Sequence, residues 1–166
     1  MRIGYVSLPG RGETDQVLAA LAARLQADGL ALAGAVQHNI GAEDCRCDMD
    51  LQILPDGPVL RISQNLGSGS QGCRLDAAVL ETAVVAVAQR LPGASLLILN
   101  KFGKHEAEGR GFRQMLADAA ASGLPVLIGL PERQRQAFAD FAGDLAEEVP
   151  PAQLHDWALA AIAGVA

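Results

Sequence analysis

Aromatic residues are scarce in this sequence: they make up 4% of its 166 residues, although hydrophobic residues make up 50%. A core with so few rings must be aliphatic and rich in alanine, which is typical of helices packed on a parallel sheet. Apolar runs are short, and none reaches the roughly 18 residues that a membrane span requires. A chain of this length can bury a core as one domain, residues 1–166, without disulfides or metal.

Cysteine is also rare, with three in the chain. An odd number of cysteines, with no positively charged apolar leader at the start, favours free thiols and a cytoplasmic location over a disulfide framework. Cys45 and Cys47 could bind a thiophilic metal together with Cys73. Structural zinc sites usually show two paired clusters, however, so we favour free thiols over a metal site.

Clustered positive charge is missing as well, because 19 acidic residues exceed 13 basic ones and the net charge is −6. Nucleic-acid-binding proteins usually present a basic patch, so this composition argues against a nucleic-acid partner. An anionic ligand would need a local cationic site. A protein partner is the other alternative.

Residues 7–14, Ser-Leu-Pro-Gly-Arg-Gly-Glu-Thr, have the spacing of a phosphate-binding loop, Gly-x-x-x-x-Gly-Lys-Ser/Thr. Ser7 stands for the first glycine, Gly12 for the second and Glu13 for the lysine. Thr14 keeps the hydroxyl position, and we expect it to cap the following helix. A carboxylate in place of the lysine repels phosphate and argues against efficient nucleotide hydrolysis. An ordinary glycine-rich turn is the alternative.

Strand and helix patterns alternate along the chain. Apolar runs predict strands at residues 2–8, 30–36, 95–99, 125–130 and, at an edge, 145–149. Helical spacing predicts helices at residues 14–28, 76–91, around 112–119, 132–142 and 152–163. Alternating polarity about a Pro-Asp-Gly-Pro turn predicts a β-hairpin at about 48–63. These elements predict a three-layer α/β fold with a mostly parallel sheet, and the continuously apolar strand at 95–99 should be central.

Ligands of such sheets gather at the carboxyl ends of the strands, where three polar segments fall at residues 9–14, 65–74 and 100–106. The candidate ligand-binding residues in these segments are Gly10, Arg11, Gly12, Glu13, Thr14, Ser68, Ser70, Arg74, Asn100, Lys101 and Lys104. Their cations could converge on a tetrahedral oxyanion such as phosphate, sulfate or molybdate. A flexible surface loop with dispersed cations is the alternative. If the chain is an enzyme, the catalytic candidates are Lys101, Lys104 and Glu106.

Residues 7–14 and 100–106 together resemble the small P-loop nucleoside-triphosphatases called cancer-related nucleoside-triphosphatases. In that family the strand runs into Asp-Glu-hydrophobic-Gly-Lys-hydrophobic-Glu. The positions of this sequence that match are Gly103, Lys104 and Glu106. Asn100 and Lys101 replace the acidic pair. The resemblance implies the P-loop fold, and the replacements argue against ordinary activity and make Mg²⁺ less expected than in active members.

The segments Ile-Ser-Gln-x-Leu-Gly…Gly-Cys-Arg-Leu-Asp, residues 62–76, and Asn-Lys-Phe-Gly-Lys, residues 100–104, resemble an uncharacterised bacterial family. Some of its members are described as associated with molybdenum transport. We therefore expect a nucleotide- or oxyanion-binding accessory protein with a degenerate P-loop, linked to molybdenum handling. The alternatives are an active nucleoside-triphosphatase with rearranged charges and a non-catalytic interaction scaffold.

Two departures from the family pattern have opposite charges. Glu13 stands where a lysine is expected, and Lys101 stands where a carboxylate is expected. We therefore predict an ion pair between Glu13 and Lys101, or between Glu13 and Lys104. The alternative is that Glu13 is a solvated first-turn carboxylate favoured by the helix dipole.

Overall fold

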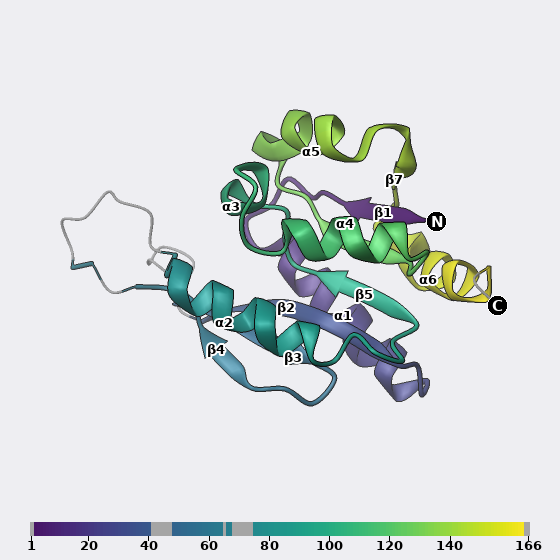
Figure 1. The fold of residues 1–166 in the computed structure, drawn as a ribbon, viewed down its shortest axis with the longest axis horizontal. Helices are drawn as coiled ribbons and strands as arrows, with labels where there is room; N and C mark the ends of the chain where they lie inside the picture. Colours follow the sequence, from purple (N-terminus) through teal and green to yellow (C-terminus); the bar gives the residue numbers. More distant parts are fainter. Residues whose placement is uncertain (1, 41–47, 65, 68–74, 165–166) are drawn as a thin grey trace.

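The computed structural model describes residues 2–40, 48–64, 66–67 and 75–164 (Figure 1). The strands of this part of the chain form one sheet in the order β4-β3-β2-β5-β6-β1-β7. Their bounds are β1 (Ile3–Val6), β2 (Leu32–Ile40), β3 (Asp48–Leu54), β4 (Val59–Arg61), β5 (Leu96–Leu99), β6 (Val126–Gly129) and β7 (Ala146–Glu148). The prediction that the run at 95–99 is central is confirmed, because β5 has three strands on either side.

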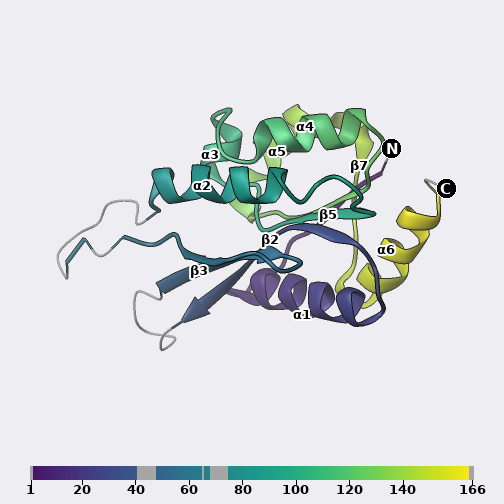
Figure 2. The same ribbon diagram turned by 60° about the horizontal axis from the view of Figure 1, so that its bottom comes forward.

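Helices cover both faces of the sheet (Figure 2). They are α1 (Glu13–Ala27), α2 (Ala77–Ala88), α3 (Lys104–Ala107), α4 (Arg113–Ala121), α5 (Arg135–Ala142) and α6 (Leu154–Ala163). Buried residues of α1 and α6 pack on one face, and those of α2, α4 and α5 pack on the other. The predicted three-layer α/β fold is confirmed. No helix in the described ranges combines the length and the apolar character needed to cross a membrane.

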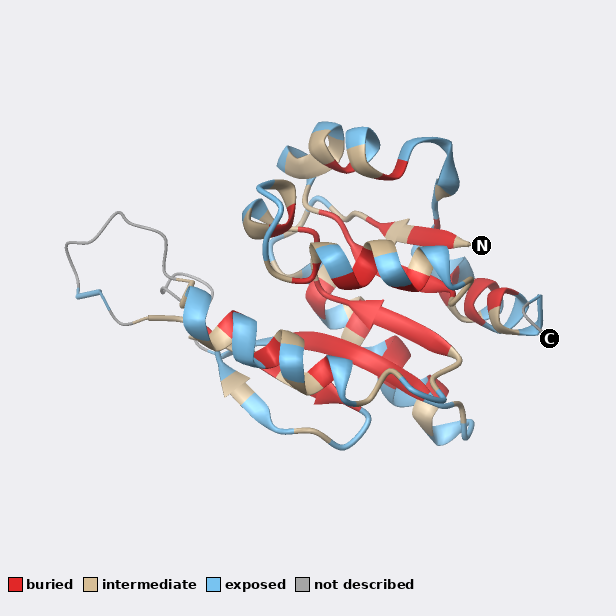
Figure 3. Cartoon of the chain, in the orientation of Figure 1, coloured by how far each residue is buried: buried red, intermediate tan, exposed pale blue. Residues whose placement is uncertain are grey.

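Burial follows this layering, with the buried residues concentrated on the sheet and on the helix sides that face it (Figure 3). The α1 side is aliphatic apart from Trp157, which is 8% exposed. The other side contains most of the few rings: Phe102 meets Phe138 edge-on at 5.2 Å, and Phe138 meets Tyr5 at 5.4 Å. Four of the six aromatic residues, Tyr5, Phe102, Phe138 and Phe141, therefore form one cluster between the sheet and α5.

The sheet is parallel except at the predicted hairpin. β1, β2, β5, β6 and β7 pair in parallel, whereas β3 pairs antiparallel with both β2 and β4. β2 continues four residues beyond its predicted end at residue 36, because its polar second half pairs with β3, from Gln37 opposite Leu51 to Ile40 opposite Asp48. Gly34 in β2 has φ 133°, and a Cβ there would overlap the carbonyl of Ile98, so the close approach of β2 to β5 requires glycine.

Candidate functional site

The phosphate-loop-like segment connects β1 to α1. α1 begins at Glu13, after Gly12 in the left-handed conformation (φ 74°), and among the described residues no side chain caps its first turn. The prediction that Thr14 caps the helix is wrong: Thr14 lies inside the first turn, and its Oγ1 accepts the N–H of Leu8 at 3.1 Å. The Thr14 hydroxyl therefore links the loop to the helix through a hydrogen bond. It does not accept from the first-turn N–H groups of α1, as a capping side chain would.

The predicted ion pair of Glu13 is absent. Glu13 Oε2 accepts the N–H of Gly10 at 3.0 Å, and a Cβ at Gly10 would overlap this carboxylate. Among the described residues, no ion pair joins Glu13 to Lys101 or Lys104, and Lys104 lies 3.7 Å from Glu108 instead. Glu13 turns back onto its own loop because the glycine leaves room beside an N–H donor.

Asp15 is the carboxylate that sequence reasoning missed. It is 6% exposed, and its oxygens accept hydrogen bonds from the side-chain amides of Asn39 at 2.6 Å, Asn100 at 2.9 Å and Gln37 at 3.4 Å. A buried carboxylate needs such donors to offset its loss of hydration. The helical spacing does indicate this burial, because Asp15 lies three positions before Leu18, on the face of α1 that is buried.

Asn100 and Lys101 follow β5 at the centre of the sheet. Asn100 is 4% exposed, and within the described part of the chain its Oδ1 has no hydrogen-bond partner. Its Nδ2 donates to Asp15 Oδ1 at 2.9 Å, so the Oδ1 of Asn100 points away from Asp15. Lys101 is half-buried, and none of the described residues forms an ion pair with it.

A pocket of about 120 Å³ brings the loop and Lys101 together. Its lining consists of Leu8, Gly10, Gly12, Thr14, Asp15, Lys101, Gly129 and Pro131. The pocket lies at the carboxyl ends of β1 and β6, which are neighbours in the sheet. The connection after β1 leads to β2, toward the β4 edge of the sheet, whereas the connection after β6 leads to β7 at the opposite edge. This reversal makes the pocket a topological switch point, where open α/β sheets bind their ligands.

Glu106, one of the catalytic candidates, is buried inside its own segment. Its oxygens accept the N–H groups of Gly103 at 2.9 Å and Phe112 at 3.1 Å. Desolvation by burial raises the pKa of Glu106, and the hydrogen bonds from Phe112 and Gly103 oppose this shift. Glu106 is 4% exposed, and both of its carboxylate oxygens accept backbone hydrogen bonds. It therefore stabilises the segment that joins α3 to α4.

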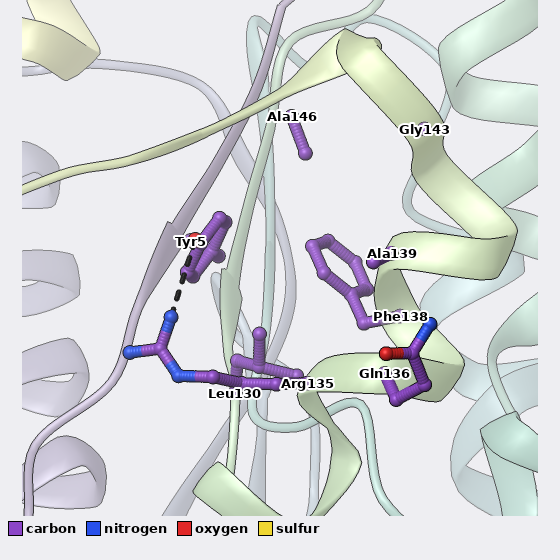
Figure 4. A pocket seen from close by; sticks show the side chains of 8 residues that line it. All are labelled: Tyr5, Leu130, Arg135, Gln136, Phe138, Ala139, Gly143 and Ala146. Carbon is purple, nitrogen blue, oxygen red and sulfur yellow. Dashed lines mark hydrogen bonds between the residues drawn. The ribbon is translucent and has the colours of Figure 1, made fainter.

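A separate cavity of about 290 Å³ lies beside α5 (Figure 4). Tyr5 and Phe138 face it, and Arg135 stands at its side with a hydrogen bond to the Tyr5 hydroxyl at 3.4 Å. The hydrogen bonds that Arg135 donates to Glu148 and Glu132 raise its pKa, so this cation already has two carboxylate partners. Lys101, in contrast, has no carboxylate partner among the described residues.

Several predicted site residues lie outside the described residues. They are Ser68, Ser70, Arg74, Cys45, Cys47 and Cys73. Arg11 is exposed next to the pocket residues Gly10 and Gly12. In the ranges that the structure describes, no group of three or more His, Cys, Asp or Glu side chains is arranged to hold a metal ion. The expectation of free thiols thus stays a prediction.

Comparison with solved structures supports the fold. The chain is similar to a human cancer-related nucleoside triphosphatase, with a TM-score of 0.64 over 99% of this chain and 97% of that one. The two sequences are 14% identical, so the likeness concerns architecture alone. The P-loop type of fold implied by residues 7–14 and 100–106 is confirmed.

Sequence comparison gives a relative and a family. The chain is 39% identical over 146 residues to the molybdenum import ATP-binding protein ModC 2 of Bradyrhizobium diazoefficiens. The match covers 87% of this chain but spans 16% of that protein's length. A family model matches residues 3–157, nearly the whole chain. This chain therefore belongs to the family described as protein of unknown function (DUF2478).

Proposed function

We propose that this protein binds a small tetrahedral oxyanion, or the phosphate group of a nucleotide, in the pocket between β1 and β6. The observation that carries the proposal is Lys101, a half-buried ammonium without an ion-pair partner among the described residues, beside the glycine loop that begins α1. An ammonium, loop N–H groups and the positive end of a helix dipole together favour an anion.

The size of the pocket favours an oxyanion over a whole nucleoside. Sites for drug-sized ligands usually measure about 300–1,000 Å³. The pocket of about 120 Å³ has room for a group such as phosphate or molybdate, and the rest of a nucleotide would extend outside it. Because the chain has a net charge of −6, such a local site is needed to hold an anion.

We propose further that the protein does not hydrolyse nucleotides efficiently. P-loop enzymes use carboxylates to hold Mg²⁺ and to position water. Here the residue at the end of β5 is the amide Asn100, while Asp15 is enclosed by three amide donors and Glu106 by two backbone donors. An active nucleoside-triphosphatase with rearranged charges is the second candidate, because Lys101 lines the loop pocket.

We also propose that the protein takes part in molybdenum handling. The relative named as a molybdenum import ATP-binding protein suggests an accessory role in molybdenum handling, which makes molybdate a ligand to test. The chain spans 16% of that protein, so the relative's own ATP-binding role is not transferred.

Isothermal calorimetry with phosphate, molybdate, ATP and GTP, each with and without Mg²⁺, tests the proposal. We expect at least one oxyanion to bind without Mg²⁺. Lys101→Ala should weaken that binding about tenfold or more, because a hydrogen bond to a charged group contributes about 1.5–3 kcal/mol. Lys104→Ala is the matched control, since Lys104 is exposed and does not line this pocket.

The contrary outcomes are distinct. Phosphate release that needs Mg²⁺ and is lost in Lys101→Ala would favour the active enzyme. If no ligand produces heat or a thermal shift, oxyanion binding is refuted. A tight protein partner in that case would favour the interaction scaffold.

A further inference from the structure

A second cavity lies on the other side of the end of β5. It measures about 180 Å³ and is bounded by β2, β3, the start of α2 and residues 100–106. Its apolar wall consists of Leu51, Ile62, Leu80 and Phe112, which are buried, with Met49 and Leu75, which are partly buried. A cavity of about 150 Å³ lined by Leu, Ile and Phe is large enough to bind benzene. This cavity therefore has room for one ring.

Three cationic side chains line the cavity, those of Lys101, Lys104 and Arg133, together with the imidazole of His105 and the amides of Gln37 and Asn100. Glu106 is the acidic residue among the described lining, and its carboxylate is bound to the backbone of Gly103 and Phe112. In a chain with a net charge of −6, a rim of this kind is locally positive.

Arg133 and Lys104 are the exposed cations of this rim, and Lys104 lies 3.7 Å from Glu108. Within the described part of the chain no ion pair includes Arg133, whereas Arg135, two residues later, contacts Glu132 at 2.6 Å and Glu148 at 2.9 Å. The carboxylates of Glu132 and Glu148 therefore pair with Arg135 and not with Arg133. Arg133 keeps its charge available at an apolar cavity, which suits an anion attached to an apolar body.

We propose that this cavity is a binding site for an organic anion that carries a single ring. The ring packs against the wall formed by Leu51, Leu80 and Phe112, and the anionic group contacts Lys101 and Arg133. Of the described residues that line the oxyanion pocket, Lys101 alone also lines this cavity. The site therefore goes beyond the proposed oxyanion function, although the two sites share Lys101.

Calorimetry with three probes tests the ligand class: phenyl phosphate, inorganic phosphate and phenol. Phenyl phosphate should bind about 10- to 100-fold more tightly than phosphate, as expected for full burial of an aromatic side chain. It should also bind more tightly than phenol, which lacks the anionic group. Equal affinity for phenyl phosphate and phosphate, or for phenyl phosphate and phenol, would overturn the proposal.

Two variants locate the site. Leu75→Trp adds bulk at a partly buried wall position, and it should remove the advantage of phenyl phosphate while leaving the affinity for phosphate unchanged. Arg133→Gln should weaken phenyl phosphate about tenfold, in keeping with the loss of a hydrogen bond to a charged group. Arg133 is exposed, so its replacement leaves the core intact. Arg24→Gln, on the exposed side of α1, is the control and should have no effect.

The outcomes separate this site from the oxyanion pocket. Binding of phenyl phosphate that depends on Leu75 and Arg133, in a protein that binds none of phosphate, molybdate, ATP and GTP, supports this site and refutes the proposed function. Binding of phosphate, with phenyl phosphate unaffected by either variant, refutes this site and leaves the proposed function standing.

Discussion

Two acidic residues in the first turn of α1 have different environments although they are two positions apart. Glu13 is exposed and bonds to the N–H of Gly10 in its own loop. Asp15 faces the sheet and accepts amide hydrogen bonds from residues of β2 and from Asn100. Because adjacent helical positions differ by about 100° in direction, a shift of two positions moves a carboxylate from solvent to the core.

Burial of Glu106 predicts a dependence of stability on pH. Its pKa in the folded chain is raised above the ordinary value of 4.5, so the folded chain holds this proton more tightly than the unfolded chain. Its contribution to stability is fully present below about pH 4.5 and is lost as the pH rises through the raised pKa. The free energy of unfolding of the wild type, measured with urea, should therefore fall relative to Glu106→Gln over this window.

Glu108 supplies the control for this measurement. The hydrogen bond from Arg110 lowers the pKa of Glu108, so its contribution is present above the unfolded pKa and is lost as the pH falls. The difference between wild type and Glu108→Gln should therefore have the opposite sign of slope. Parallel pH curves for wild type and Glu106→Gln would contradict the assignment of Glu106 as a buried acid.

At the scale of elements, α1 and α2 begin differently. α1 follows Gly12 without a side-chain cap and faces the pocket, whereas α2 is capped by Asp76, whose carboxylate accepts the N–H groups of Ala78 at 3.0 Å and Val79 at 3.2 Å. A cap on α2 satisfies orphan donors and stabilises the helix. The start of α1 lacks such a cap, which is the arrangement that an anion site needs.

Removal of the α2 cap should have a measurable cost. Asp76→Ala should lower the free energy of unfolding by about 0.5–2 kcal/mol, because two N–H groups lose their acceptor. Thr82→Ala, on the exposed side of the same helix, should change it by no more than about 0.5 kcal/mol. Urea unfolding curves of both variants check this. Equal effects of the two substitutions would show that Asp76 does not act as a cap.

At the scale of the whole molecule, one sheet joins both helical layers. Each face has its own cluster of buried residues, and the strands β1, β2, β5 and β6 contribute to both. Separation of either layer would expose the face of the same strands to water. The chain should therefore unfold as one unit, in line with the predicted single domain.

The single tryptophan tests this cooperativity. Trp157 in α6 packs beside Gly4 of β1, and its Nε1 donates to Glu147 at 2.7 Å. Its fluorescence reports the α6 side of the sheet, whereas far-ultraviolet circular dichroism reports every helix. The two urea transitions should coincide within error. A fluorescence midpoint clearly below the dichroism midpoint would show that α6 separates first and that the chain is not one cooperative unit.

The fold was more predictable than the site. Apolar periodicity predicts the strands and helices, because it depends only on the residues within each element. Turn residues predict the hairpin at about 48–63. The polar end of β2 was missed because Gln37 and Asn39 look like loop residues until β3 pairs with them. Asp15 was missed for a related reason: its partners are 22, 24 and 85 residues away.

The sequence by itself determined the three-layer α/β architecture, the central place of residues 95–99 and the approach of residues 9–14 and 100–101 to the carboxyl edge. These follow from burial of apolar faces, which depends on spacing within each element. Only the tertiary structure decided that Glu13 bonds to its own loop and that Asp15 accepts hydrogen bonds from three side-chain amides. It also decided that Lys101 lines two cavities and has no ion-pair partner among the described residues. Those outcomes depend on strand order and register, which bring distant side chains within hydrogen-bonding distance.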